Sequence, residues 1–521
     1  MEIARTGFAE KIVEALLTGQ HRNHSYAGVS NLRIPRTKHM RVLLFFAGLF
    51  LSFGVSAAEP ELPELGDESA SVLSPQQERM LGEDFMRRAR RGLDIGDDPE
   101  INEYLQALGR RLTAHSDRPP QEFRFFIVND PSINAFAVPG GFIGVNAGLI
   151  LAAHNEAELA AVLAHETAHI TQRHIPRMIA EANRTSLPAM AAMLAAIVLA
   201  GASGQAGGAA IALTSASLIQ KELNFSRAFE QEADRLGMGI LTRAGYDARA
   251  MPAFFERLLD WSKLYESNLP EFLRTHPITT RRISESRDHA EQFTKRPTSD
   301  NTQFFHAQAK LRVQSKTSPA EAVREFKATL AAGNYRHADA ERYGLALALL
   351  ANQDWEAARK EIQGLLQRRP DFIPYRIALA EVELAAGRTA EALAVYVAAL
   401  KKTPGNQALE RHYAAALLKS GHPDTARELL ARAVRTQPGD PDLHKLLATA
   451  AGEAGKKLEA HRSLAEYYYL TGNPKAAIDQ LQIAARYAGD SFYDQSSLEA
   501  RIKEIKDEVL RYTGKDVERD R

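Results

Sequence analysis

The chain contains 521 residues, of which 45% are hydrophobic and 25% are charged. This length exceeds what a single core accommodates, so we expect two or three folded domains. Basic and acidic residues balance at 65 each, so no overall field draws the protein to nucleic acid, and we expect no nucleic-acid partner. Because cysteine is absent, disulfides, cysteine nucleophiles and thiolate metal sites are excluded, and His, Asp and Glu remain as the candidate metal ligands.

The N-terminus predicts export. Lys38 and Arg41 flank the start of an apolar run, Val42–Val55, which small residues follow, as in a secretory signal peptide. As a helix this run would be about 21 Å long, whereas a bilayer core is roughly 30 Å thick, so the length disfavours the alternative of a retained anchor. We expect a signal peptide over residues 40–58, preceded at 1–39 by an over-long N-terminal extension.

The next segments predict helices and a small sheet. Ser74 as an N-cap and Pro75 at the first helical position begin an amphipathic helical pattern. Aromatic and β-branched residues alternate at 122–130, and a Pro-Gly-Gly turn interrupts 133–150, so we expect a small antiparallel sheet. Residues 156–182 then keep helical periodicity with no Gly or Pro before Pro176, which predicts one long helix.

Residues 186–220 carry no charged side chain, but the sequence GASGQAGG divides them into halves that are each too short to span a membrane. Two interpretations stay open. One is a buried helix pair, and the other is a mobile hairpin that lies beside the functional site or against a partner or a membrane surface.

The C-terminal half repeats itself. Three residue types recur at intervals of 34 residues, namely Pro370, Pro404 and Pro438, Gly387, Gly421 and Gly455, and Ala358, Ala392, Ala426 and Ala460. A 34-residue unit of two helices is typical of tetratricopeptide repeats, which stack into a curved α-solenoid with a concave binding surface. We therefore expect a solenoid over 302–515 that binds polypeptide. Gly472 lies half a period after Gly455, which leaves the register of the last units open.

Residues 165–169 read HETAH, inside the long predicted helix. His165 and His169 are four residues apart, so they share one helix face at about 5–6 Å and can bind one metal ion. A catalytic zinc takes three protein ligands and keeps a fourth position for water. The metzincin pattern would put its third histidine at Ile175, which excludes that class, and we expect His174, off the required face, to be an exposed turn residue.

The third ligand is sought downstream, where Glu230 and Asp234 again lie four residues apart in a helical pattern. Glu230 can reach the metal, while Asp234 can accept a hydrogen bond from the far ring nitrogen of a ligand histidine. Glu166, beside the first histidine, can act as the general base that deprotonates water for peptide hydrolysis. We expect one Zn²⁺ per subunit, bound by His165, His169 and Glu230.

The surrounding sequence resembles the zinc gluzincin peptidases that include the prenyl-protein peptidases, and it is most similar to the periplasmic β-barrel assembly-enhancing proteases. The matching stretches are NAFAVPGGFIGVNAGLI, ELAAVLAHETAHI, FSRAFEQEADRLG and LRTHPITTRRI, in that order, and the repeats complete the resemblance. It implies a mainly α protein, with an α+β zinc metallopeptidase domain at 70–295 before the solenoid. It also implies the roles already given for the five residues His165, Glu166, His169, Glu230 and Asp234.

The resemblance implies two further features. An edge strand that holds extended substrate by main-chain pairing would comprise Asn134, Ala135, Phe136, Ala137 and Val138. The alternative is an ordinary sheet edge protected by Pro139. His276, in a His-Pro motif, would be a regulatory fourth metal ligand that keeps the enzyme latent, and the alternative is a capping or buried structural histidine.

The function implied is a periplasmic zinc endopeptidase in outer-membrane protein quality control. It would degrade misassembled β-barrel precursors and assist those that can still mature, with the repeats recruiting clients or the barrel assembly machinery. The alternative is a non-proteolytic periplasmic chaperone or scaffold that acts through the solenoid. Glu166 favours the enzyme, because a structural zinc needs no adjacent base and is usually closed by four protein ligands.

Overall fold

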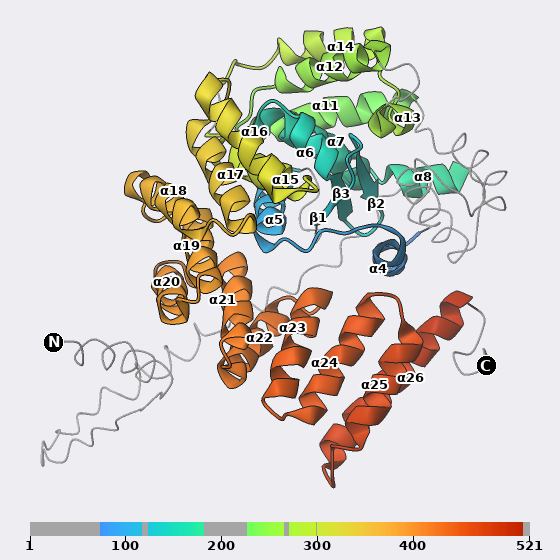
Figure 1. Ribbon diagram of the computed structural model, residues 1–521. Helices are drawn as coiled ribbons and strands as arrows, with labels where there is room; N and C mark the ends of the chain where they lie inside the picture. Colours follow the sequence, from blue (N-terminus) through green and yellow to red (C-terminus); the bar gives the residue numbers. More distant parts are fainter. Residues whose placement is uncertain (1–72, 117–122, 182–226, 265–269, 298–299, 514–521) are drawn as a thin grey trace, which may run out of the picture. The chain divides into compact units, whose positions relative to one another are not determined.

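The computed structural model describes residues 73–116, 123–181, 227–264, 270–297 and 300–513 (Figure 1). The expected N-terminal extension, the signal peptide and the uncharged segment 186–220 lie outside the described residues. Among the residues that are described, no helix combines the length and the apolar character needed to cross a membrane.

The N-terminal part consists of helices around a small sheet. Its elements are α4 (Pro75–Gly92), α5 (Pro99–Thr113), β1 (Arg124–Val128), β2 (Ala135–Val138), β3 (Phe142–Asn146), α6 (Ala147–Ala152), α7 (Glu156–Thr171), α8 (His174–Glu181), α11 (Arg227–Arg243), α12 (Ala250–Leu264), α13 (Glu271–Thr275) and α14 (Thr280–Ala290). The predicted start of the first helix is confirmed. Ser74 Oγ accepts a hydrogen bond from the Gln77 backbone N–H at 3.3 Å, and Gln77 Oε1 accepts one from the Ser74 backbone N–H at 2.8 Å.

The small sheet is present, but it is mixed rather than wholly antiparallel. Its strand order is β1-β3-β2. β2 and β3 form the expected antiparallel hairpin, whose turn uses Gly140 and Gly141 at positive φ. β3 lies between β1 and β2, and it runs parallel to β1. The alternation that predicted the strands contains no information about their spatial order, so the parallel pair could not be read from it.

α7 is the central helix of this part. Asn155 caps its N-terminus by accepting a hydrogen bond from the Glu158 N–H at 3.1 Å. Its residues are almost all buried, and it contacts α5, α11, α12 and strands β2 and β3. Gly237 lets α11 approach closely, because a Cβ at this position would lie 3.0 Å from the backbone N and Cα of His165. This close contact sets the separation between the two helices.

The long helix expected over 156–182 is divided into two. α7 ends at Thr171, and α8 begins at His174. Between them, Arg173 adopts the left-handed conformation with φ of 53°, which costs a non-glycine residue on the order of 1–2 kcal/mol. Arginine has no preference for this conformation, so the sequence carried no signal for the break.

The C-terminal part is the expected solenoid of helical hairpins. Its helices are α15 (Thr302–Gln314), α16 (Pro319–Ala332), α17 (Ala338–Ala351), α18 (Trp355–Arg368), α19 (Ile373–Ala385), α20 (Thr389–Lys402), α21 (Gln407–Lys419), α22 (Pro423–Thr436), α23 (Pro441–Glu453), α24 (Lys457–Leu470), α25 (Pro474–Ala485) and α26 (Phe492–Thr513). The repeated Gly387, Gly421 and Gly455 have φ of 78°, 75° and 73° and connect the two helices of their hairpins. Gly472, at φ of 79°, makes the same turn between α24 and α25.

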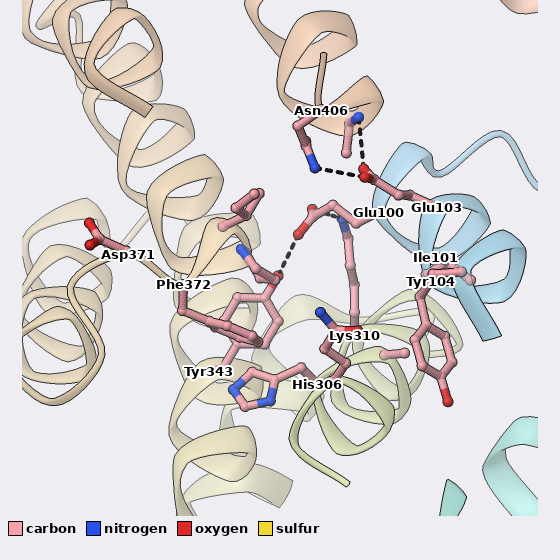
Figure 2. Close-up of a pocket in the computed structure, with 16 residues that line it drawn as sticks. Glu100, Ile101, Glu103, Tyr104, His306, Lys310, Tyr343, Asp371, Phe372 and Asn406 are labelled. Atoms are coloured by element: carbon pink, nitrogen blue, oxygen red, sulfur yellow. Dashed lines mark hydrogen bonds and ion pairs between the residues drawn. The ribbon is translucent and has the colours of Figure 1, made fainter. Parts of the chain in front are cut away.

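Helix α5 joins the two parts. Glu103 accepts hydrogen bonds from Asn406 Nδ2 at 2.6 Å and from the Ala408 N–H at 3.0 Å. The Tyr343 hydroxyl donates to Glu100 Oε2 at 3.3 Å. These contacts border a cavity of about 280 Å³ between α5 and the first repeats (Figure 2).

Candidate metal centre

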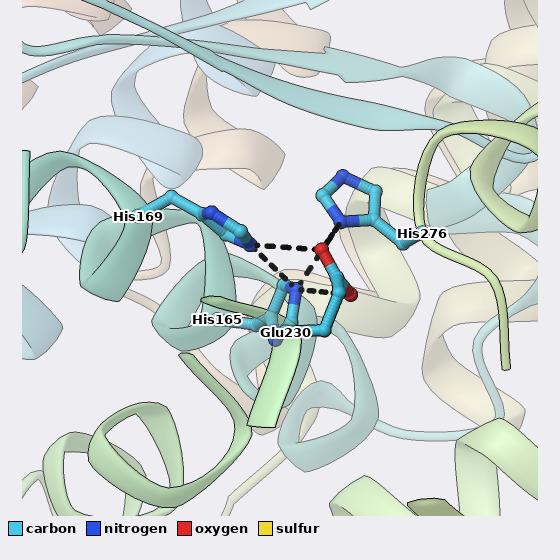
Figure 3. Close-up of side chains that lie close together, drawn as sticks. All are labelled: His165, His169, Glu230 and His276. Atoms are coloured by element: carbon cyan, nitrogen blue, oxygen red, sulfur yellow. Dashed lines mark hydrogen bonds and ion pairs between the residues drawn. The ribbon is translucent and has the colours of Figure 1, made fainter. Parts of the chain in front are cut away.

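Four buried side chains from three helices converge at one point (Figure 3). His165 and His169 come from α7, Glu230 from the first turn of α11, and His276 from the C-cap position directly after α13. Each is at most 2% exposed. The sequence placed the first three together, and the structure brings His276 into the same cluster.

Four separations between donor atoms are close to the spacing around a small tetrahedral metal ion. His165 Nε2 lies 3.0 Å from His169 Nε2 and 3.3 Å from His276 Nδ1. Glu230 Oε1 lies 2.9 Å from His276 Nδ1 and 3.4 Å from His169 Nε2. Ligands about 2.0–2.1 Å from a tetrahedral ion are roughly 3.3 Å apart. The residues therefore fit a metal ion with nitrogen and oxygen ligands.

The electrostatics of the cluster suit metal binding. Burial lowers the pKa of His169 well below its usual value, against the opposing effect of Glu230, so its ring is neutral and has a lone pair to give. Burial alone would raise the pKa of Glu230, but His276, His169 and His165 outweigh it and hold that pKa well below its usual value. Glu230 is therefore an anionic donor.

Asp234 and Arg282 orient the metal-binding side chains from the side opposite the cluster. Asp234 Oδ1 lies 3.0 Å from His165 Nδ1, on the far side of the ring from the cluster. Arg282 donates to Asp234 Oδ2 from Nε and to Oδ1 from its second amino group, both at 2.9 Å. Its remaining amino group pairs with Glu230 Oε2 at 2.7 Å. Asp234 was singled out in the sequence, whereas Arg282 was missed, because nothing in the sequence distinguishes it from the exposed Arg281.

Glu166 lies between the cluster and strand β2. It is 1% exposed, and its Oε1 lies 3.5 Å from His276 Nε2. Burial raises the pKa of Glu166, although His276, His165 and the backbone N–H of Ala137 oppose the shift. A raised pKa suits a carboxylate that takes up a proton and then returns it.

His174 contradicts the expectation of an exposed turn residue. It is 0% exposed, and its Nδ1 lies 2.8 Å from Nδ1 of His169. Burial lowers its pKa to about 4, against the opposing effect of Glu232. The expectation failed because it continued the helix through Arg173, whose left-handed conformation turns His174 back toward α7.

The expected edge strand corresponds to β2. Ala135, Phe136, Ala137 and Val138 pair with β3 on one side, and among the described strands no partner lies on the other. Asn134 precedes the strand, and its carbonyl accepts from the Asn146 N–H at 3.0 Å. β2 also contacts α7, so an extended chain added to this edge would lie close to Glu166.

Comparison with known proteins agrees with this geometry. Residues 99–290 match peptidase family M48, and residues 343–407 and 383–450 match tetratricopeptide repeats. The fold and the site thus define a metalloendopeptidase with a repeat domain, in agreement with the predicted fold class.

More specific relatives cover nearly the whole chain. It is 32% identical to the β-barrel assembly-enhancing protease of Yersinia pestis over 453 residues, which cover 87% of this chain and 93% of that protein. Identity to the β-barrel assembly-enhancing protease of Escherichia coli is also 32%, over 85% of this chain and 91% of that protein. The mitochondrial metalloendopeptidase OMA1 of Schizosaccharomyces pombe is 33% identical over 199 residues, or 38% of this chain and 56% of that protein. The chain belongs to the family of β-barrel assembly-enhancing proteases.

Proposed function

We propose that this protein is a zinc-dependent endopeptidase of the periplasm that cleaves misassembled outer-membrane β-barrel precursors and assists others to mature. The observation that supports this most directly is the position of Glu166, which lies beside the converging donors of His165, His169 and Glu230 and beside the edge strand β2. The names of the relatives supply the client class.

The chemistry follows from the positions of these residues. His165, His169 and Glu230 would hold the zinc ion, which would supply Lewis-acid activation of water and of the substrate carbonyl. Glu166 accepts the proton of the attacking water and returns it to the amine nitrogen that leaves. Asp234 and Arg282 hold His165 and Glu230 in place. No covalent link to the protein is needed.

β2 provides the matching substrate surface. A peptide that pairs with Ala135–Val138 by main-chain hydrogen bonds is held extended and independent of its side chains. Such pairing suits unfolded β-barrel precursors, whose segments form paired strands in the mature barrel. The competing interpretation, an ordinary protected edge, predicts that cleavage is insensitive to a proline placed on this edge.

The substitution Glu166→Gln tests the reaction. The amide keeps the shape of the side chain but does not accept a proton, so we expect cleavage of an unfolded protein to fall at least about 100-fold, the lower bound for a general base. Zinc content, measured by elemental analysis, should stay at one per subunit. Undiminished cleavage with zinc retained would refute the role of Glu166 and favour the chaperone or scaffold alternative.

The same variant tests which clients the protein binds. We propose that the solenoid recruits β-barrel precursors or their assembly machinery. A Glu166→Gln protein should therefore accumulate uncleaved clients, identified by mass spectrometry after crosslinking in the periplasm. Enrichment of β-barrel precursors is expected, whereas a client set without them would refute the proposed substrate class.

We also propose that His276 keeps the enzyme latent. Its Nδ1 lies 3.3 Å from His165 Nε2 and 2.9 Å from Glu230 Oε1, and its Nε2 lies 3.5 Å from Glu166 Oε1. As a fourth ligand it would occupy the position of the attacking water and contact the base. His276→Ala should raise peptide cleavage on the order of tenfold, if the closed arrangement holds about nine molecules in ten. The exposed His115 gives a control, since His115→Ala should change nothing. Unchanged cleavage in His276→Ala would refute latency.

A further inference from the structure

A chain of hydrogen-bonded side chains extends from the metal centre to Glu232, a carboxylate that does not belong to the site as described above. His169 Nδ1 lies 2.8 Å from His174 Nδ1, and His174 Nε2 lies 3.2 Å from Glu232 Oε2. His174 is fully buried, and Glu232 is partly exposed. The chain thus runs from ligand to buried ring to a carboxylate near the surface.

The donor and the acceptor of each hydrogen bond in this chain can be assigned by starting from His169. Nε2 of His169 faces the other donors, so it must offer a lone pair to the metal, and the hydrogen of the neutral ring then resides on Nδ1. That N–H donates to His174 Nδ1, which must accept. The hydrogen of His174 then resides on Nε2 and donates to Glu232. Each bond has one donor and one acceptor, so the arrangement is self-consistent.

The surroundings fix His174 in this orientation. Its ring stacks on Phe229 of α11, with centroids 4.6 Å apart and planes 16° from parallel. The guanidinium of Arg177 lies over the Phe229 ring, 4.5 Å from its centroid, and donates to Glu232 Oε2 at 3.1 Å. The left-handed Arg173 immediately before His174 supplies the turn that makes the contact with His169. Strained residues of this kind concentrate at functional sites.

We propose that His174 and Glu232 position His169 for metal binding, by fixing the tautomer and orientation of its ring and so setting the metal affinity of the site. This inference rests on the proposed metal-dependent function. It gives each ligand histidine its own support: Asp234 holds His165 directly, whereas a ring and a more distant carboxylate hold His169. Both are positioning residues, since neither faces the donor set.

Two substitutions separate positioning from packing. In His174→Phe the ring volume and the stack on Phe229 are kept, but the acceptor is lost. In His174→Asn the volume is reduced, but an amide oxygen stands near the position of Nδ1 and can accept from His169. We expect His174→Phe to weaken Zn²⁺ binding about 10–100-fold and His174→Asn to weaken it by no more than about threefold. A residue with a purely structural role would give the opposite order.

The measurement is the dissociation constant for Zn²⁺, obtained by competition with a fluorescent chelator. All variants carry Glu166→Gln, so the result does not depend on proteolysis and self-cleavage is avoided. Failure of the parent protein to bind Zn²⁺ would refute the proposed function. Tight binding by the parent with an unchanged constant in His174→Phe would refute the positioning role alone.

Glu232→Leu removes the end of the chain, a contact that His174→Asn also loses, and should weaken Zn²⁺ binding about threefold, which is less than the effect of removing the acceptor itself. The matched control is Glu285→Leu. Glu285, in α14, accepts from Gln231 Nε2 at 2.9 Å and pairs with Arg281. These contacts do not involve the two rings, so its loss should leave the constant unchanged. Equal constants for the two variants would overturn the role of Glu232.

Discussion

Among the described residues, the metal centre and a cluster of partly buried ionisable groups at the junction with the repeats make different kinds of contact. The metal centre comprises His165, His169, Glu230 and His276. The junction cluster lies between α5 and the repeats and comprises Asp98, Glu100, Lys310, Glu381 and His412.

In the junction cluster every carboxylate faces a cation of the protein itself. Lys310 Nζ lies 2.8 Å from Asp98 Oδ2 and also pairs with Glu100. His412 Nδ1 lies 3.0 Å from Glu381 Oε1. In the metal centre Glu230 Oε2 also faces a cation, Arg282, but the ring nitrogens of His169 and His276 both face Nε2 of His165. A cluster in which opposite charges alternate is neutralised by its own residues and is structural. Ring nitrogens that converge on one point instead indicate a site for a metal ion.

The largest effect is expected from Lys310→Met. The substitution removes Lys310 from Asp98 and Glu100, whose side chains are only 14% and 9% exposed, and breaking a largely buried pair in this way costs about 3–5 kcal/mol. Urea unfolding should show this loss in the free energy of unfolding. The metal centre should be untouched, so the Zn²⁺ constant of the folded variant should equal that of the parent.

The control is Lys263→Met, which makes the same change at an exposed pair. Lys263 Nζ lies 3.0 Å from Asp260 Oδ1, and both side chains are about two-thirds exposed. Its free energy of unfolding should change by less than about 1 kcal/mol. Similar losses in the two lysine variants would mean that the junction cluster is not closed by its own charges.

The sequence predicted the fold wherever local chemistry decides it. The N-cap Ser74, the hairpin turn before Phe142 and the 34-residue period all appear in the structure. The sequence did not predict the parallel pairing of β1, which depends on strand order. It also did not predict the break at Arg173, because tertiary contacts impose a conformation that arginine does not favour.

The residues of the site can likewise be divided into those that local sequence patterns predict and those that depend on tertiary contacts. His165 and His169 share a helix face by periodicity alone, and the spacing of Glu230 and Asp234 suggested the second helix. His174 and Arg282 were not predicted as site residues, because their roles arise from chain turns that bring them back to α7 and α11. The junction cluster was also missed, since no local pattern connects α5 with residues some two hundred positions later.

The next effect is expected from Gly237→Ala, which alters the metal centre without changing a charge. A Cβ there would lie 3.0 Å from the N and Cα of His165, so α11 must move away from α7 and carry Glu230 with it. Overpacking of this kind costs about 1–3 kcal/mol. We expect that loss in urea unfolding together with weaker Zn²⁺ binding.

Gly239, two residues along the same helix, provides the matched control. Among the described residues, a Cβ there would meet only the Arg243 side chain, at 3.5 Å, so Gly239→Ala should stabilise α11 by about 0.5–1 kcal/mol and leave Zn²⁺ binding unchanged. Equal behaviour of the two variants would refute the view that close contact between α7 and α11 holds the metal centre.

The smallest effect concerns the pH dependence of the junction cluster. Burial disfavours the charged form of His412, but Glu381 and Glu100 outweigh it and raise its pKa. Burial likewise disfavours the charged form of Glu381, but His412 and Lys310 outweigh it and lower its pKa. A raised histidine pKa gives stability that is lost as pH rises through the folded value, and a lowered glutamate pKa gives stability that is lost as pH falls through the folded value.

The pair should therefore stabilise the fold most between about pH 4.5 and 6.5, the ordinary values of the two groups. We expect the difference in free energy of unfolding between the parent and His412→Gln to be largest near the middle of this window and to shrink toward about pH 9. Loss of metal at acid pH affects both proteins and cancels in the difference. A difference that stays constant across this range would mean that His412 is neutral in the folded protein, and the junction cluster would then depend on Lys310 alone for its positive charge.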